Sequence, residues 1–271
     1  MTMTEQNDVK RTHSKKPLFR APDSNIIAVA SGKGGVGKTW FSSTLAYALA
    51  QKGKRVLLFD GDLGLANVDI QLGVMVKRDL KDVIEGTLSL ERVIHHFKDG
   101  GFDVIAGRSG QATLSSLPLL RLNEIMKQLR SLAKKYDAVI IDLGAGVDKT
   151  VRFMAAMASL TLLVTTEEPT SLTDAYAFIK LSHSTGHSDT IKLVINMASS
   201  QRDGERTYKT LAKASSTFLK ITPDLVGILP LDRQVRESIR TQTPFLMRYP
   251  TSESAEIFDK ISQNVLETIK S

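Results

Sequence analysis

The stretch SGKGGVGKT, Ser31 to Thr39, decides the fold of this 271-residue chain. It follows an apolar run at 26–30, which is typical of a buried parallel strand, and it precedes a helical segment at 40–50. Glycines in such a turn let the backbone approach an anion closely, and the start of the following helix adds a favourable dipole. The motif G-x-x-x-x-G-K-[ST] matches from Gly32 to Thr39, so the stretch predicts a phosphate-binding loop.

The side chains of this loop have separate expected roles. Lys38 is expected to reach the β- and γ-phosphates of a nucleotide, and the hydroxyl of Thr39 to coordinate Mg²⁺. A glycine-rich turn that only connects a strand to a helix is the alternative, but the Lys-Thr pair and both flanking elements favour the phosphate site. The predicted nucleotide-binding residues of the loop are Gly32, Lys33, Gly34, Gly35, Val36, Gly37, Lys38, Thr39 and Trp40.

Aspartates follow two further apolar strands. The run at 55–60 ends in Asp60, with Asp62 two residues later, and the run at 136–142 ends in Asp142. Ligands of parallel sheets bind at the carboxyl ends of strands, so these carboxylates are expected beside the loop. Asp60 and Asp62 share a face of an extended backbone, so one can hold the water shell of Mg²⁺ while the other orients an attacking water. Asp142 ends a strand of the Walker B type, which delivers a carboxylate to the magnesium shell; a plain acidic turn is the alternative for the first pair.

Composition is that of an ordinary soluble chain. Apolar residues make up 42% and charged residues 24%, and no apolar run approaches the roughly 18 residues of a transmembrane helix. Residues 1–20 are basic and lack the apolar centre of a secretory signal. The chain has no cysteine, which excludes disulfides and thiolate-bound metals. We therefore expect a cytoplasmic protein.

The charge balance is basic, with a formal net charge of +7. Residues 1–20 hold five cations against two carboxylates, a surplus of three. Such an arm can contact nucleic acid or anionic lipid, but a solvated tail is the preferred interpretation. His95 and His96 suggest a metal site, yet an exposed helix end is preferred because no cysteine or third histidine is near them.

The order of the apolar segments predicts the fold. About six buried strands alternate with helices, and the candidate ligand residues follow the strands. This predicts an α/β fold with a doubly wound, mostly parallel sheet and helices on both faces. The expected organisation is a flexible basic arm over 1–24, one ATPase domain over 25–250 and a C-terminal amphipathic helix over 251–271, packed on that domain.

Local signals predict several helix boundaries. The segment 90–96 shows a helical pattern. Pro169 is expected to end a strand, with Thr170 or Ser171 capping a helix at 172–183. Further helices are expected at 80–84, 119–135, 207–220, 235–240 and 254–270.

Lys33 is not required by the general loop motif, since it stands one residue after the first glycine. The heptapeptide KGGVGKT at 33–39 resembles the deviant phosphate loop of the MinD/ParA family of dimerising ATPases. The resemblance implies a P-loop NTPase of the deviant Walker A class that uses ATP, ADP and Mg²⁺. It also implies a dimer in which Lys33 reaches the partner subunit's nucleotide and stabilises transition-state charge, much as an arginine finger does. A solvated loop lysine is the alternative.

The same resemblance implies roles outside the loop. The segment from Asp60 to Asp69 resembles the family's first switch region, which makes Asp62 the water-positioning catalytic residue beside Lys33 and Lys38, and makes Asp60 a magnesium residue. Asp142 begins a segment, DLGAG, that resembles the second switch. Family members often have proline at position 143 or 145, where this chain has leucine and alanine.

Two later strand ends are candidates for adenine contacts. Asn196 ends the apolar strand 191–196, and its amide can read the donor and acceptor edge of adenine. The resemblance supports that role, while an ordinary strand-end asparagine is the alternative. Pro230, Leu231 and Asp232 resemble the segment that flanks the adenine ring in the family.

Two short segments indicate a branch within the family. The residues EPTS at 168–171 with DAY at 174–176, and DLGLAN at 62–67, resemble the bacterial flagellar-number regulators. The best hypothesis is a slow, partner-stimulated ATPase switch that regulates the number or placement of flagella. Alternatives are DNA or plasmid partition, division-site or other polar-machine positioning, an ATP-dependent small-molecule ligase, and a scaffold without turnover. Residues 1–24 lack the DQAxxLR motif of many flagellar regulators, which argues against their GTPase partner.

The expected partners are a second copy in the ATP state and a regulatory protein. Family members grip membranes with a C-terminal amphipathic helix, which implies peripheral attachment to the inner membrane as an option. The polar face of the helix at 254–270 carries Lys260 and Lys270 against three carboxylates, which argues against this option. DNA is a less favoured partner, because the arginines at 233, 236 and 240 are more simply explained as a solvated face.

Overall fold

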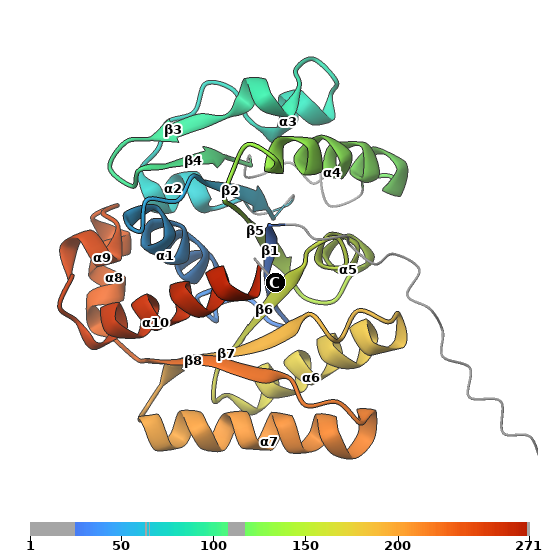
Figure 1. Cartoon of the computed structure of the whole chain (residues 1–271), viewed down its shortest axis with the longest axis vertical. Helices are drawn as coiled ribbons and strands as arrows, with labels where there is room; N and C mark the ends of the chain where they lie inside the picture. The colour runs from blue at the N-terminus through green and yellow to red at the C-terminus, as the bar shows by residue number, and fades with distance from the viewer. Residues whose placement is uncertain (1–24, 63, 65, 108–116, 270–271) are drawn as a thin grey trace, which may run out of the picture.

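An eight-stranded sheet forms the centre of the computed structural model, which describes residues 25–62, 64, 66–107 and 117–269. The strand order is β3-β4-β2-β5-β1-β6-β7-β8, and every neighbouring pair is parallel except β3 with β4 (Figure 1). The α/β fold class expected from the sequence is therefore confirmed. The strands are β1 (Ile26–Ser31), β2 (Val56–Gly61), β3 (His95–Phe97), β4 (Phe102–Ile105), β5 (Ala138–Ala145), β6 (Leu160–Thr165), β7 (Ile191–Ala198) and β8 (Asp224–Pro230).

Helices cover both faces of this sheet (Figure 1). The apolar core on one face includes side chains of α1, α2, α9 and α10, and the core on the other face includes side chains of α3 to α6. The helices are α1 (Lys38–Gln51), α2 (Val68–Leu72), α3 (Leu80–Ile84), the 3₁₀ helix η1 (Leu90–Val93), α4 (Leu119–Ala133), α5 (Lys149–Ala155), α6 (Pro169–Ser184), α7 (Gln201–Leu219), α8 (Arg233–Arg240), α9 (Phe245–Arg248) and α10 (Glu253–Thr268).

The connections reverse direction beside β1. From β1 the chain passes through α1 to β2 on one side, whereas β6 lies on the other side of β1. A sheet wound in both directions leaves a crevice at the carboxyl ends of its strands at this point. The loop 32–37 follows β1 there, and in the register of β2 and β5 Asp60 lies opposite Asp142. The strand order therefore places the candidate residues at one edge of the sheet.

The last helix, α10, packs on α1 and β8. The ring of Phe258 lies 5.4 Å from the ring centroids of both Trp40 and Phe41, and Ile261 lies against Gly227. Ile257, Ile261, Val265 and Ile269, which recur every four residues, thus face the core of the molecule. Within the described residues, no helix combines the length and the apolar character needed to cross a bilayer.

The expected helix at 90–96 is wrong. The chain forms η1 and then β3, an antiparallel edge strand on β4. Phe97 is buried with its ring 5.3 Å from that of Phe102, so strand pairing overrides the helical pattern. His96 therefore lies in a strand, with Nδ1 2.8 Å from Asp103 Oδ1. No group of three His, Cys, Asp or Glu side chains that could hold a metal ion occurs in the described part of the chain, so the structure offers no support for a metal site at His95 and His96.

Helices α6 and α7 begin earlier than expected. Pro169 is the first residue of α6 and Glu168 its N-cap, so neither Thr170 nor Ser171 caps the helix. Proline suits this position because its missing N–H would have no partner there. The Ser171 hydroxyl instead accepts from the N–H of Thr166. Helix α7 starts at Gln201 rather than 207, and the side chain of its N-cap, Ser200, accepts from the N–H of Asp203.

Two other expectations differ or stay open. β5 continues to Ala145, so most of the segment expected to move as a second switch is part of the sheet in this structure. The short helices α2, α5 and α9 were not expected, since each shows too little periodicity to be recognised. The proposed arm at 1–24 lies outside the described residues.

Candidate phosphate- and metal-binding site

The loop 32–37 has the geometry of a phosphate cradle. Gly35 and Gly37 have φ of 82° and 83°, values that favour glycine strongly. At Gly32 the limit is space, because a Cβ would lie 2.3 Å from the backbone carbon of Asp174 in α6. A Cβ at Gly37 would likewise lie 2.4 Å from Asn196 Nδ2. These glycines let the loop pack tightly between α6 and β7.

The start of α1 provides further donors. No side chain caps this helix, whose N-cap is Gly37. The first N–H groups of an α-helix have no partner inside the helix, so those of Lys38, Thr39 and Trp40 are available to an anion. Together with the cradle, this arrangement fits a phosphate group.

Three donors from the first turns of α1 converge on Asp142. Lys38 Nζ lies 3.0 Å from Asp142 Oδ1, and Thr39 Oγ1 donates to Oδ2 over 2.7 Å. The hydroxyl of Ser42 lies 2.8 Å from Oδ1. The side chains of Lys38 and Asp142 are 7% and 2% exposed, so the pair is held in a nearly dry site. The sequence analysis missed Ser42, although its position four residues after Lys38 places both on one helix face.

Asp60 lies fully buried beside this cluster. Its carboxylate accepts the backbone N–H groups of Asp62, Asn67 and Val68 over 3.1–3.2 Å. Burial first, and the negative charge of Asp142 second, raise the pKa of Asp60 to about 7. Two adjacent carboxylates, one disfavoured as an anion, form a donor set that a divalent cation would stabilise. Thr39, Asp60 and Asp142 thus fit the predicted magnesium site.

The protonation of Asp60 predicts how stability depends on pH in magnesium-free solution. Its pKa of about 7 exceeds the roughly 3.9 of an aspartate in an unfolded chain, so between these values the folded state binds more protons. Stability therefore falls as pH rises from 5 to 7, by about 2 kcal/mol or about 5 °C in Tm. Asp60→Asn should flatten the profile. Thermal unfolding of both proteins at pH 5 and 7 measures this, and an equal loss in both would contradict it.

Asp62 lies in the first predicted switch segment and borders the second. Its Oδ1 accepts the N–H of Gly64 over 3.3 Å. A Cβ at Gly144, in β5, would lie 3.5 Å from the same oxygen. The carboxylate is partly exposed and borders the end of the strand that carries Asp142. This position is compatible with water positioning, which stays a prediction.

Lys33 is bound within its own chain. Its Nζ lies 2.7 Å from Glu168 Oε2 and 2.9 Å from Thr170 Oγ1. Glu168 is the N-cap of α6 and Thr170 lies in its first turn, and the lysine side chain remains 38% exposed. The sequence analysis did not identify Glu168 as a site residue, because only the fold brings it to the loop. Lys33 must therefore break this intramolecular contact before its side chain can bind a second copy of the chain.

The predicted adenine contacts lie at the ends of β7 and β8. Asn196 is buried, and its Nδ2 donates to the carbonyl of Val36 over 2.8 Å. The N–H of Leu231 donates to the carbonyl of Ala198, which joins the two strand ends. Asn196 therefore borders the loop and Pro230 and Leu231 lie at the neighbouring strand end, but the contact of these residues with adenine stays a prediction. Asp232 has a clear structural task, since it caps α8 through the N–H of Gln234.

Trp40 lies in the core rather than beside the loop. Its indole is 4% exposed and packs edge-on against Phe245 and Phe258. The expectation that Trp40 binds nucleotide is therefore limited to its backbone N–H. The reason is that a residue in the third position of α1 turns its side chain toward α9 and α10.

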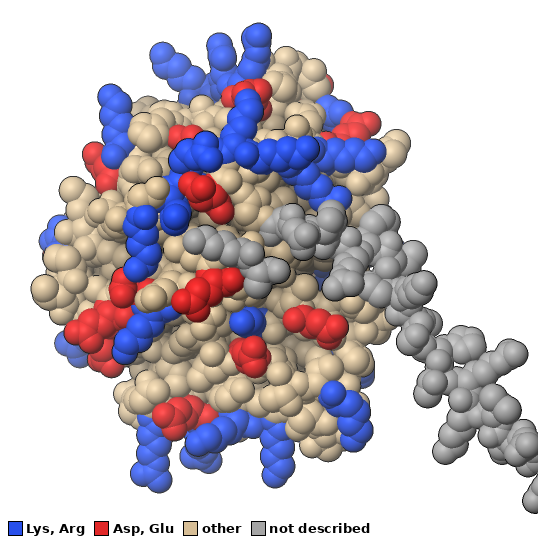
Figure 2. All heavy atoms as spheres, viewed as in Figure 1, with Lys and Arg blue, Asp and Glu red and all other residues tan. Residues whose placement is uncertain are grey.

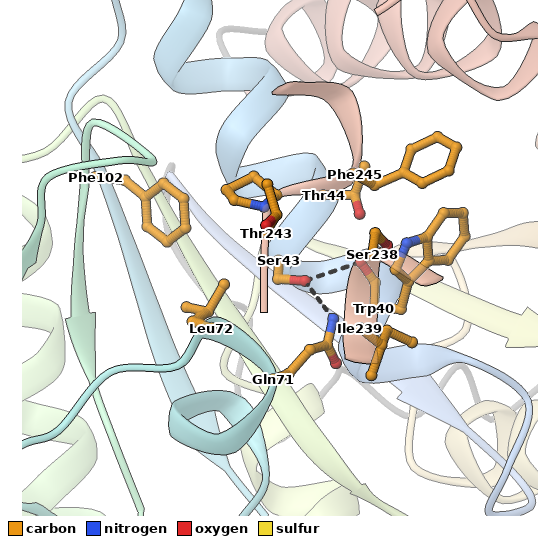
Figure 3. A pocket seen from close by; sticks show the side chains of 11 residues that line it. Trp40, Ser43, Thr44, Gln71, Leu72, Phe102, Ser238, Ile239, Thr243 and Phe245 are labelled. Carbon is orange, nitrogen blue, oxygen red and sulfur yellow. Dashed lines mark hydrogen bonds between the residues drawn. The ribbon is translucent and has the colours of Figure 1, made fainter. Parts of the chain in front are cut away.

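Below the loop, Ser43 links α1 to α2 (Figure 3). Gln71 Nε2 donates to Ser43 Oγ over 2.8 Å, and this hydroxyl donates to the carbonyl of Trp40. The three residues line a cavity of about 10 Å³ together with side chains from α8 and α9. Such a volume holds one water at most, so this cavity is not the nucleotide site. The bond ties α2, which follows the Asp62 loop, to the helix that carries Lys38.

Comparisons with known proteins agree with this geometry. A model of the ParA family, described as NUBPL iron-transfer P-loop NTPase, matches residues 23–266. The antiactivator FleN of Pseudomonas aeruginosa is 37% identical over 240 residues, which cover 89% of this chain and 85% of FleN. The flagellum site-determining protein YlxH of Helicobacter pylori is 33% identical over 220 residues, covering 79% and 74%. The solved structure of the septum site-determining protein MinD from Pyrococcus horikoshii, complexed with Mg-ADP, is similar with a TM-score of 0.75 and 30% identity, over 89% of this chain and 95% of that protein.

Proposed function

This chain belongs to the ParA/MinD family of P-loop NTPases, and from that premise we propose that it is an ATP-driven dimerising switch that regulates flagellar number or placement. The observation that carries the nucleotide part is the convergence of Lys38, Thr39 and Ser42 on Asp142 beside the glycine cradle. The flagellar part rests on the similarity to FleN and YlxH over most of the chain.

The bound ligand is ATP or ADP with Mg²⁺. A relative of similar structure holds Mg-ADP, and the residues here suit both parts of that ligand. The loop N–H groups and Lys38 bind the phosphates, and Thr39, Asp60 and Asp142 hold the metal, partly through water. Magnesium there neutralises phosphate charge. On binding, the side chains of Lys38 and Thr39 leave Asp142 and contact the ligand instead.

Hydrolysis is assigned to Asp62. Its carboxylate lies near Gly144, where the end of β2, which carries Asp60, meets the end of β5. From there it orients a water for attack on the terminal phosphate, while Lys33 and Lys38 stabilise the charge that develops. Slow turnover follows from a site that is complete only in the dimer, and a regulatory protein partner would accelerate it.

Dimerisation depends on Lys33 in this proposal. To reach the nucleotide of a second copy, Lys33 must leave Glu168 and Thr170. An exposed ion pair contributes only about 0.2–1 kcal/mol, so an anionic triphosphate competes with it easily. The contact of Lys33 with Glu168 and Thr170 in its own chain therefore holds this lysine only weakly in the monomer.

Lys33→Ala is expected to bind ATP but to remain monomeric, because the loop backbone is retained and the trans contact is lost. Light scattering of the variant with ATP and Mg²⁺ measures this. Glu168→Gln is the matched variant, since it frees Lys33 without changing that lysine, and it should dimerise at lower ATP concentration than the original protein. An ATP-dependent Lys33→Ala dimer would refute the interface role.

The cellular role is tested by counting flagella. Deleting the gene in the cells from which the chain comes should change the number or position of flagella seen by electron microscopy. The original gene should restore the count, and one encoding Lys38→Ala should not. Normal flagella after deletion would remove the flagellar part of the proposal and leave the nucleotide part intact.

Partition of DNA and positioning of other machines are the alternatives within the family. An ATP-bound Asp62→Ala protein separates them by co-sedimentation with duplex DNA and with anionic liposomes. Salt-sensitive DNA binding in the ATP state would favour the partition role. Liposome binding would indicate membrane attachment; it would require α10 to expose residues such as Phe258, which now pack on α1. Iron transfer by a thiolate-bound cluster is not proposed, because the chain has no cysteine.

A further inference from the structure

The outer face of α7 carries a row of cations that the nucleotide site does not use. Arg202, Arg206, Lys209 and Lys213 all line one surface hollow and are all exposed. At 3.6 residues per turn they fall within a sector of about 60°, and the row spans about 16 Å along the helix. We call these four residues the α7 row. Figure 2 shows Lys and Arg side chains projecting at the lower edge of the molecule, where Figure 1 places α7.

Most of the α7 row has no counter-charge. Lys209 lies 3.7 Å from Glu205, one helical turn away. Within the described residues, Arg202, Arg206 and Lys213 form no ion pair. Like charges at such spacing destabilise a helix slightly, so helix stability does not explain the row.

The helix beneath the row is rigidly held. Its opposite face packs on β7, β8 and α6, with Gly204 so close to Ile228 that a Cβ would lie 2.3 Å from that side chain. Ser200 caps its first turn. The row is therefore a fixed surface that needs no ordering before it binds a partner.

We propose that the α7 row is a docking surface for an acidic segment of a partner protein. Four cations with spacings of four, three and four residues match an acidic helix with carboxylates at the same intervals. The hollow also contains the carboxylates of Asp203 and Glu205 and the hydroxyl of Thr210. A phosphate backbone carries charge continuously and would meet both carboxylates, whereas an acidic helix presents its carboxylates only at the intervals of the cations, which favours a protein partner over nucleic acid.

The docking surface is connected to the nucleotide loop by two adjacent glutamates. Glu167 accepts the N–H and the hydroxyl of Ser199, just before α7, over 2.8 and 2.9 Å. Glu168, the next residue, holds Lys33. When Lys33 leaves Glu168, the turn that anchors the start of α7 loses one of its ties. This coupling rests on the proposed function, and it makes affinity for the acidic segment depend on the nucleotide state.

The test measures binding of a fluorescein-labelled, alanine-rich helical peptide with glutamates at i, i+4, i+7 and i+11, by anisotropy at low salt. The α7 variant carries R202E, R206E, K209E and K213E. The matched control carries R92E, K98E, K127E and K134E, which change the net charge equally at other exposed positions. A glutamine version of the peptide and a labelled DNA duplex complete the set.

The proposal expects the α7 variant to lose roughly tenfold or more in peptide affinity, with the control variant within about twofold of the original protein. Equal losses in both variants would show a net-charge effect and overturn the proposal. A duplex that binds in an α7-dependent way while the peptide does not would also overturn it. Should the α7 variant unfold, R206Q with K213Q replaces it, and thermal unfolding accompanies each measurement.

The coupling has a separate readout. Peptide affinity should differ between the ADP and ATPγS states, and Glu167→Gln should remove the difference. Equal affinity in both states overturns the coupling and leaves the docking surface intact. Failure of the original protein to bind ATP would overturn the proposed function instead, so the two failures are distinguishable.

Discussion

Lys38→Ala is expected to abolish nucleotide binding, with a loss of roughly a hundredfold or more in ATP affinity. Lys38 is the one buried cation at the loop in the described residues, and a phosphate in the cradle would accept from its ammonium group. Removing it takes away charge-assisted hydrogen bonds in a nearly dry site, where they are strongest. Isothermal titration calorimetry with ATP and Mg²⁺ measures the effect.

The control for this variant lies at the other end of the same helix. Lys52 is the C-cap of α1, at the end of the helix away from the loop, and it pairs with Asp259 of α10. Lys52→Ala should therefore bind ATP normally. Lys38→Ala also leaves Asp142 without its cation, which destabilises a buried carboxylate. If the single variant unfolds, the double variant Lys38→Ala, Asp142→Asn relieves that charge, and its ATP affinity is compared with that of Asp142→Asn alone because Asp142 also belongs to the magnesium site. Unchanged ATP affinity in a folded Lys38→Ala protein would refute the phosphate-site assignment.

Asp62→Ala is expected to bind ATP, to hydrolyse it roughly a hundredfold more slowly, and to accumulate as a dimer. The phosphate ligands stay in place, while the carboxylate that would orient the attacking water is lost. Because hydrolysis opens the dimer, blocking it traps the closed state. Phosphate release and light scattering in ATP measure the two effects on one sample.

Asp69→Ala is the matched control for this loop. Asp69 lies in α2, seven residues later, and among the described residues its carboxylate accepts only the N–H of Ile70. Its removal should leave hydrolysis within about twofold of the original rate. Normal turnover in Asp62→Ala would remove Asp62 from the catalytic role, and slow turnover without a dimer would separate hydrolysis from dimer opening.

The family assignment made from KGGVGKT is confirmed by the match over residues 23–266 and by the flagellar relatives. Local motifs predict well here because the phosphate loop is built from consecutive residues. The expected roles of Lys33, Asp62 and Asn196 remain predictions, since they concern a nucleotide and a second copy.

Errors in the expected elements have a common cause. The segment 90–96 has a helical pattern, yet its end forms β3 because β4 offers a pairing edge and Phe97 a place beside Phe102. Trp40 belongs to the loop's helix by sequence, but the packing of α9 and α10 places its indole in the core. In both cases residues distant in the chain decided the outcome, and periodicity reports only on neighbours.

The sequence by itself determined the strand-loop-helix unit, the carboxylates at strand ends and the sheet class, because each depends on nearby residues and on apolar pattern. Only the tertiary structure placed Glu168 on Lys33 and Glu167 on Ser199, since these contacts join segments more than thirty residues apart. It also decided that the α7 row faces outward, with three of its four cations in no ion pair among the described residues. Such contacts depend on which faces the packed sheet leaves exposed, and no local pattern contains that information.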